Sequence, residues 1–146
     1  CASNAPPISG PAAARYRSAV HQYQARYGGL SLTARQAADL ASNPAMRVYD
    51  SPGQVLACCF DPAKALCRRD TRASENPTTP DLSGCDSRCA NIARTDTHIE
   101  TLRSEVTHLH QEIASPATPE PFRARLTLRA QRHQALIDTH TAGEHE

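Results

Sequence analysis

Four cysteines in the middle of the chain constrain its fold more than any other feature. They are Cys58, Cys67, Cys85 and Cys89, in the order C-x8-C-x17-C-x3-C. Four thiolates that converge from two short segments make a closed tetrahedral site for one Zn²⁺. The chain has little else to hold its middle third together, since it contains 4 Tyr, 2 Phe, no Trp and 11 Pro. We therefore predict a zinc site with four cysteine ligands.

The predicted zinc is structural, because four protein ligands leave no open position at which water could be activated. Two exchanges of a ligand stay open. Cys59 competes with Cys58 for one position, and His98 follows Cys89 closely enough to replace a thiolate. Three interpretations without zinc also stay open: disulfides in an oxidising compartment, buried free thiols, and an iron–sulfur cluster.

The first residues raise a separate alternative. Cys1-Ala-Ser-Asn4 would suit the mature start of a bacterial lipoprotein, whose remaining cysteines would then form extracellular disulfides. We favour instead a fragment of a longer cytoplasmic protein. The sequence has no run of about 18 apolar residues, so no membrane span is predicted.

Two short helices are predicted near the start of the chain. An apolar stripe with spacings of four, three and four residues favours a helix over 11–27; it comprises Tyr16, Val20, Tyr23 and Tyr27. Thr33 and Gln36 fit a capping box for a second helix, which ends near Ser42. A helix-turn-helix would need a third, recognition helix, and the segment that follows is too short to supply one.

A heptad pattern begins after the cysteines. Its apolar positions have spacings of 7, 3, 4, 3 and 4 residues and are Ile92, Ile99, Leu102, Val106, Leu109 and Ile113. Residues 115–119 contain two prolines that break the pattern, and a weaker stripe follows to Ile137. The two stripes predict an antiparallel αα-hairpin. Pairing of the first stripe with another chain, as a homo- or hetero-oligomer, is the alternative.

The fold class predicted from these patterns is mostly α, in four parts. Residues 1–49 form short helices, 50–90 a small Cys-rich loop module, 91–140 the helical hairpin, and 141–146 a frayed tail. Cys85 and Cys89 are then expected just before and at the start of the long helix, where the helix dipole favours thiolates.

Charge is unevenly distributed along the chain. Residues 1–72 carry nine basic and four acidic side chains, a balance of +5, whereas 73–146 carry seven and eleven, a balance of −4. An electropositive first half is suited to phosphate, so DNA is the predicted partner, although an ordinary solvated surface would look the same. The predicted phosphate contacts are Arg15, Arg17, Arg26, Arg35, Arg68, Arg69 and Arg72.

Several segments resemble the cysteine-rich C-terminal region of actinobacterial tyrosine recombinases (phage-type integrases) and transposon-associated proteins. They include Arg26-Tyr-Gly-Gly-Leu30, Asp61-Pro-Ala-Lys-Ala-Leu-Cys67 and Cys85-Asp-Ser-Arg-Cys89-Ala-Asn-Ile-Ala-Arg-Thr. The resemblance spans about residues 6–139, and it favours Cys58 over Cys59 as the shared cysteine. It implies a role in DNA integration and recombination.

The resemblance does not extend to catalysis. Tyrosine recombinases need a His-x-x-Arg pair, and no histidine of this chain is followed three residues later by Arg. The sequence also contains no glycine-rich phosphate loop and no Ser/His/Asp set at an informative spacing. We therefore expect a non-catalytic accessory module that binds DNA or assists assembly, folded around the zinc. A protein-interaction module and a secreted disulfide-containing lipoprotein are the alternatives.

Overall fold

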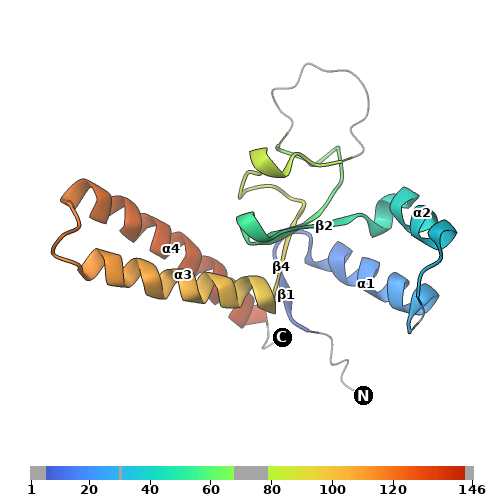
Figure 1. Cartoon of the computed structure of the whole chain (residues 1–146), viewed down its shortest axis with the longest axis horizontal. Coiled ribbons are helices and arrows are strands. Elements are labelled where there is room, and N and C mark those ends of the chain that lie inside the picture. Colours follow the sequence, from blue (N-terminus) through green and yellow to red (C-terminus); the bar gives the residue numbers. More distant parts are fainter. Residues whose placement is uncertain (1–5, 30, 68–78, 144–146) are drawn as a thin grey trace.

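The computed structural model describes residues 6–29, 31–67 and 79–143, which form four α-helices and a small sheet (Figure 1). The helices are α1 Ala13–Tyr27, α2 Ala34–Ser42, α3 Asp96–Ala114 and α4 Glu120–Gly143; the strands are β1 Ile8–Ser9, β2 Val48–Ser51, β3 Leu56–Cys59 and β4 Ile92–Thr95. The prediction of a mostly α chain is confirmed at this level. The sheet was not predicted.

The sheet joins segments from both ends of the chain. Its strand order is β1-β4-β3-β2, and each of these neighbouring pairs is antiparallel. Cys58 lies opposite Ile92, and Ala57 lies opposite Ala93. Because successive side chains of a strand point to opposite faces, this register places Cys58 and Cys59 on different sides of the sheet.

The predicted start of the long helix is wrong. Ile92 belongs to strand β4, and α3 begins only at Asp96. The four residues Ile92–Thr95 form a strand in the buried part of the sheet. Their pairing with β3 outweighs the seven-residue spacing by which Ile92 fitted the heptad pattern of the helix. Cys85 and Cys89 consequently lie in the segment before a strand and receive no help from a helix dipole.

The region predicted as a Cys-rich loop module also contains regular structure. Strand β3 lies inside it, and β2 crosses its predicted boundary at residue 50. Pro52–Gln54 is a single 3₁₀ turn between these strands. Strands of four residues surrounded by proline and glycine leave too short a pattern for sequence periodicity to detect.

The two N-terminal helices form as predicted, and α1 covers one face of the sheet. Thr33 caps α2 through the reciprocal box with Gln36. Beneath α1, the face that carries Cys59 forms a buried cluster of Ile8, Ala12, Cys59 and Ala93, with Ala13, Tyr16 and Val48 against it. The small alanines allow the helix to approach the sheet closely.

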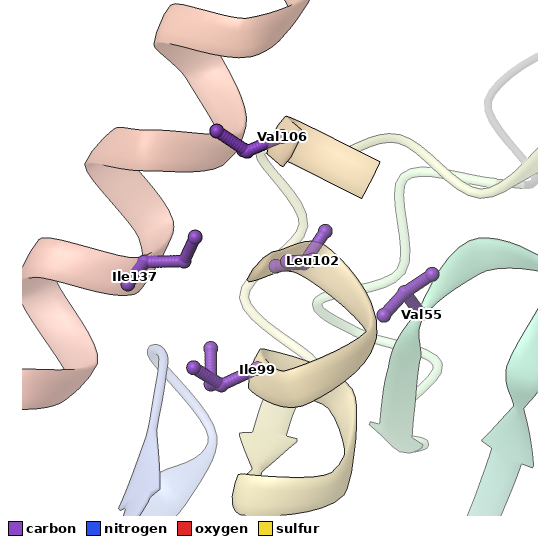
Figure 2. Close-up of a cluster of buried hydrophobic side chains, with 5 residues drawn as sticks. All are labelled: Val55, Ile99, Leu102, Val106 and Ile137. Atoms are coloured by element: carbon purple, nitrogen blue, oxygen red, sulfur yellow. The ribbon is translucent and has the colours of Figure 1, made fainter. Parts of the chain in front are cut away.

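Helices α3 and α4 lie side by side and extend away from the sheet (Figure 1). Their base is a cluster of Val55, Ile99, Leu102, Val106 and Ile137 (Figure 2). Val55 comes from the β2–β3 connection, so the cluster joins the helix pair to the sheet. The apolar stripe of α3 is therefore covered within the chain. Among the described residues, no helix is both long and apolar enough to cross a membrane.

Candidate metal centre

Cys58 sits on the face of the sheet opposite α1. The same face carries a buried cluster of Leu56, Cys89 and Ile92, against which Cys85 and Leu66 pack. Cys58 and Cys89 are buried, and Cys67 and Cys85 are half-buried. The structure thus brings segments 56–67 and 85–92 together on one side of the sheet.

The thiol of Cys58 lies within electrostatic range of four other cysteines. Burial raises its pKa to about 12, and charges on Cys85, Cys89, Cys59 and Cys67 contribute to the rise. Burial also raises the pKa of Cys85, with added contributions from Cys89 and Cys67. The three other predicted ligands therefore lie within electrostatic range of Cys58, and their thiolate forms would repel one another.

Backbone contacts hold the two cysteine segments in place. The Cys89 thiol donates to the carbonyl of Lys64 at 3.6 Å. Asn91 is fully buried, and its Nδ2 donates to the backbone carbonyl of Asp61 at 3.0 Å. The backbone carbonyl of Asn91 accepts the backbone N–H of Cys59 at 2.8 Å. These bonds join the turn after β3 to the segment before β4, so the backbone positions the cysteines that flank them.

The sulfurs share one neighbourhood without forming a coordination shell. Within residues 6–29, 31–67 and 79–143, no three His, Cys, Asp or Glu side chains are grouped tightly enough to hold a metal ion as they stand. The five cysteines in these ranges are all free. Metal binding would require the four thiols to rotate and draw together, with loss of their protons.

The geometry bears on the two alternative ligands, Cys59 and His98. Cys59 faces α1, and burial raises its pKa to about 11, while the nearby Arg15 lowers it. Both ring nitrogens of His98 are already engaged: Nδ1 accepts the Thr95 backbone N–H at 3.0 Å, and Nε2 lies 2.8 Å from Asp50 Oδ1. Neither side chain is placed to replace one of the four predicted ligands.

The predicted phosphate contacts fall into three groups. Arg15 is a structural residue, because it donates to the carbonyls of Cys59 at 2.8 Å and Ala90 at 2.7 Å and to Asn91 Oδ1 at 3.0 Å. Arg17, Arg26 and Arg35 are exposed on α1 and α2, although Arg17 also donates to the Ile8 carbonyl at 2.9 Å. Residues 68, 69 and 72 lie outside the described residues.

Arg94 on β4 is a site residue that the sequence did not reveal. It is buried on the face of Cys58, and its burial lowers its pKa, while Cys85 opposes the change. The position of Arg94 two residues after Ile92, on the same face of a strand, would have been the signal, but the strand itself was not predicted.

Comparison with known proteins gives no family: no family model, curated protein or solved structure matches the chain.

Proposed function

We propose that this chain is a non-catalytic accessory module that binds one structural Zn²⁺ through Cys58, Cys67, Cys85 and Cys89. Within a cytoplasmic recombinase-type protein of a mobile element, its role would be to bind DNA or support assembly. The observation that supports the proposal is that Cys58, Cys85 and Cys89 lie on one face of the sheet, with Cys67 within electrostatic range of Cys58.

The arrangement favours a dication for an electrostatic reason. Thiolates that repel one another in a buried setting are costly, so the thiols stay neutral without a metal. A Zn²⁺ ion supplies the opposite charge and converts the repulsion into four metal–sulfur bonds. The sheet then provides one ligand, Cys58, and the two adjoining segments provide the other three.

The metal can be tested by elemental analysis of the purified chain together with single substitutions. We expect about one zinc per chain, lost in Cys58→Ser and in Cys85→Ser. Cys59→Ala is the matched control, since it alters a buried cysteine of the same strand that faces α1. Retention of zinc by this control and its loss from the other two variants would support the site.

Other results of the elemental analysis would indicate other sites. Detection of iron with acid-labile sulfide would indicate an iron–sulfur cluster in place of zinc. Disulfides detected by thiol counting under denaturing conditions would instead support the extracellular interpretation. Absence of metal from a protein purified without chelator and supplied with zinc would contradict the proposal.

The DNA part of the proposal is supported by charge on the N-terminal helices. Residues 13–42 contain four arginines and one acidic residue, Asp39, a balance of +3. Arg26 and Arg35 are exposed there. Exposed arginines with little acidic competition suit phosphate contacts, whose affinity falls as salt rises.

A salt series tests this surface. We expect binding of duplex DNA at low salt, with a weaker affinity and a shallower salt slope in the double variant Arg26→Gln/Arg35→Gln. The control Arg103→Gln/Arg125→Gln removes the same charge from α3 and α4. Absence of binding at low salt, or equal losses in both double variants, would contradict the DNA role.

The proposal also treats α3 and α4 as an intramolecular antiparallel hairpin. Ile99, Leu102 and Val106 are buried against Ile137 of the same chain, so no partner is needed to cover them. Sedimentation is expected to give a monomer. A stable dimer would favour the interaction-module alternative, in which the stripe of α3 pairs between chains.

A further inference from the structure

A cavity of about 590 Å³ lies between the β2–β3 connection, strand β4 and the helices α3 and α4. Part of its wall is apolar, formed by Val55, Leu56, Leu102 and Leu136. The charged part comprises Arg94, Glu105, Arg129 and Arg132, with His133 beside them. Cavities of this size, lined by apolar side chains with a few polar ones, are typical of binding sites for small molecules.

Arg94 is the unusual member of this wall. The residue is only 6% exposed, and its Nε has no hydrogen-bond partner. Nη1 and Nη2 are not among the buried unpartnered atoms, and the charge that acts on the guanidinium is that of the Cys85 thiolate form. A buried N–H donor without a partner is costly, which favours a ligand oxygen that would accept from Arg94 Nε.

His133 supplies a second unpaired atom in the same cavity. Its Nδ1 is buried and lies 3.3 Å from Glu105 Oε2 but makes no hydrogen bond with it. Arg129 donates to the same carboxylate oxygen at 3.4 Å. Two of the three buried unpartnered side-chain atoms found among the described residues therefore belong to residues that line one cavity.

The charges of the wall sum to a positive value. Among the described residues, Arg94, Arg129 and Arg132 contribute +3 and Glu105 contributes −1, which leaves +2. Cys85 also lines the cavity. A zinc ion held by four thiolates carries a net charge of about −2, so the proposed zinc would bring the region close to neutral. The unpartnered Nε–H of Arg94, rather than the net charge of the wall, is then the feature that favours an oxyanion.

We propose that this cavity binds the oxyanion of a small organic molecule, a phosphate monoester, with Arg94 as its central contact. Guanidinium groups bind phosphate through directed hydrogen bonds, and three of them line the cavity. The apolar wall of Leu102 and Leu136 accepts the carbon part of the molecule. This inference does not require the proposed zinc or DNA roles, although Cys85 belongs to both the cavity and the proposed zinc site.

Calorimetric titration of the full chain with phenyl phosphate and with inorganic phosphate, at matched ionic strength in chloride, tests the site. We expect both to bind, phenyl phosphate more tightly because its ring meets the apolar wall. Benzoate, with the same ring and a single charge, is expected to bind more weakly. Equal response to chloride and phosphate would overturn the proposal.

Two substitutions locate the binding. Arg94→Met and Arg132→Met are each expected to weaken the affinity for phenyl phosphate by about tenfold or more, because each removes one cation from the site. The control Arg125→Met removes an exposed arginine of α4 that stacks on Phe122 outside the cavity. Unchanged affinity in Arg132→Met, the variant of an exposed residue, would overturn the proposal even if Arg94→Met failed to fold.

The ligand-free stability of Arg94→Met gives a second readout. Replacement of a buried guanidinium that leaves a donor unpaired by an apolar side chain of similar length should leave thermal stability unchanged or raise it. A marked loss of stability would show that the guanidinium is already compensated without a ligand, which contradicts the proposal.

Discussion

His98 and Asp50 are joined by a hydrogen bond of 2.8 Å between Nε2 and Oδ1, 48 residues apart in sequence. His98 Nδ1 accepts the backbone N–H of Thr95, so the proton of a neutral ring lies on Nε2 and is donated to Asp50. His98 thereby occupies the N3 position of a capping box for α3, a place that Gln36 fills in α2. One side chain both starts a helix and attaches it to β2.

The double role of His98 predicts an order of stability among its variants. His98→Ala should lose the cap and the bond to Asp50, at a cost of about 1–3 kcal/mol in the free energy of unfolding. His98→Gln keeps an acceptor for the cap and should lose less. Urea denaturation measures both, and zinc content is expected to stay unchanged because His98 is no ligand. Equal stability of both variants would contradict the cap.

Val55 has backbone angles of φ 54° and ψ 51°, the left-handed conformation that a β-branched residue rarely adopts. Its side chain packs with Ile99 and Leu102 at the base of the helix pair (Figure 2). The packing of this side chain offsets a backbone cost of about 1–2 kcal/mol.

This conformation predicts an unusual comparison between two variants of Val55. Val55→Ala should lose about 1–3 kcal/mol of stability through lost packing, with the strain retained. Val55→Gly loses slightly more packing but relieves the strain, so it should be no less stable than Val55→Ala. Chemical denaturation compares them directly. A glycine variant about 1 kcal/mol less stable than the alanine variant would contradict the left-handed assignment.

The helices of this chain were predictable because their signals are local. The Thr33 and Gln36 pair marks the start of α2, and the spacing from Ile99 to Leu109 marks the buried side of α3. The sheet was not predictable for the opposite reason. Each strand has two or four residues, and its partner can be distant in sequence, as in the pairing of Ile8 with Thr95. Such pairings depend on long-range contacts that no short window contains.

The candidate site was predictable only in part. The cysteine spacing predicts four ligand thiols, and the structure places Cys58, Cys85 and Cys89 on one face of the sheet. The choice between Cys58 and Cys59 follows from strand alternation, which the sequence pattern did not disclose. Arg94 could not be singled out, because its importance lies in burial without a partner, a property of the folded chain.

The pH dependence of stability should have a contribution from His133 on α4. Burial lowers the pKa of His133, Arg129 and Arg94 lower it further, and Glu105 opposes them. The unfolded chain then binds a proton at a higher pH than the folded chain, near the ordinary histidine pKa of about 6.5. Stability is therefore fully present above that pH and falls as the solution becomes more acidic.

Urea denaturation of wild type and His133→Gln between about pH 8 and pH 5 isolates this contribution, since that interval spans the ordinary histidine pKa. The variant should lose less stability on acidification. His108→Gln, which removes an exposed histidine of α3, is the control and should follow the wild type. A steeper loss in His133→Gln would mean that Glu105 dominates and the sign is reversed.

Removal of the proposed zinc should open one side of the sheet and spare the helix pair. Structural zinc contributes about 10–16 kcal/mol to the folding of small peptides, so a chelator should lower the melting temperature markedly. Amide exchange should accelerate in 56–67 and 85–92 and change little near Val106 and Ile137, whose cluster contains no cysteine. Added zinc should restore protection. Unchanged exchange in both cysteine segments would contradict a structural metal.

Arg15 was predicted from the sequence to contact phosphate, whereas its bonds to Cys59, Ala90 and Asn91 predict a role in stability. Arg15→Met should lower the free energy of unfolding by about 2–4 kcal/mol, because it leaves the oxygen atoms that accept hydrogen bonds from Arg15 unpaired between α1 and the sheet. The control Arg26→Met, at the exposed end of the same helix, should change stability by less than about 0.5 kcal/mol. An Arg15→Met protein of full stability but weaker DNA binding would restore the phosphate role.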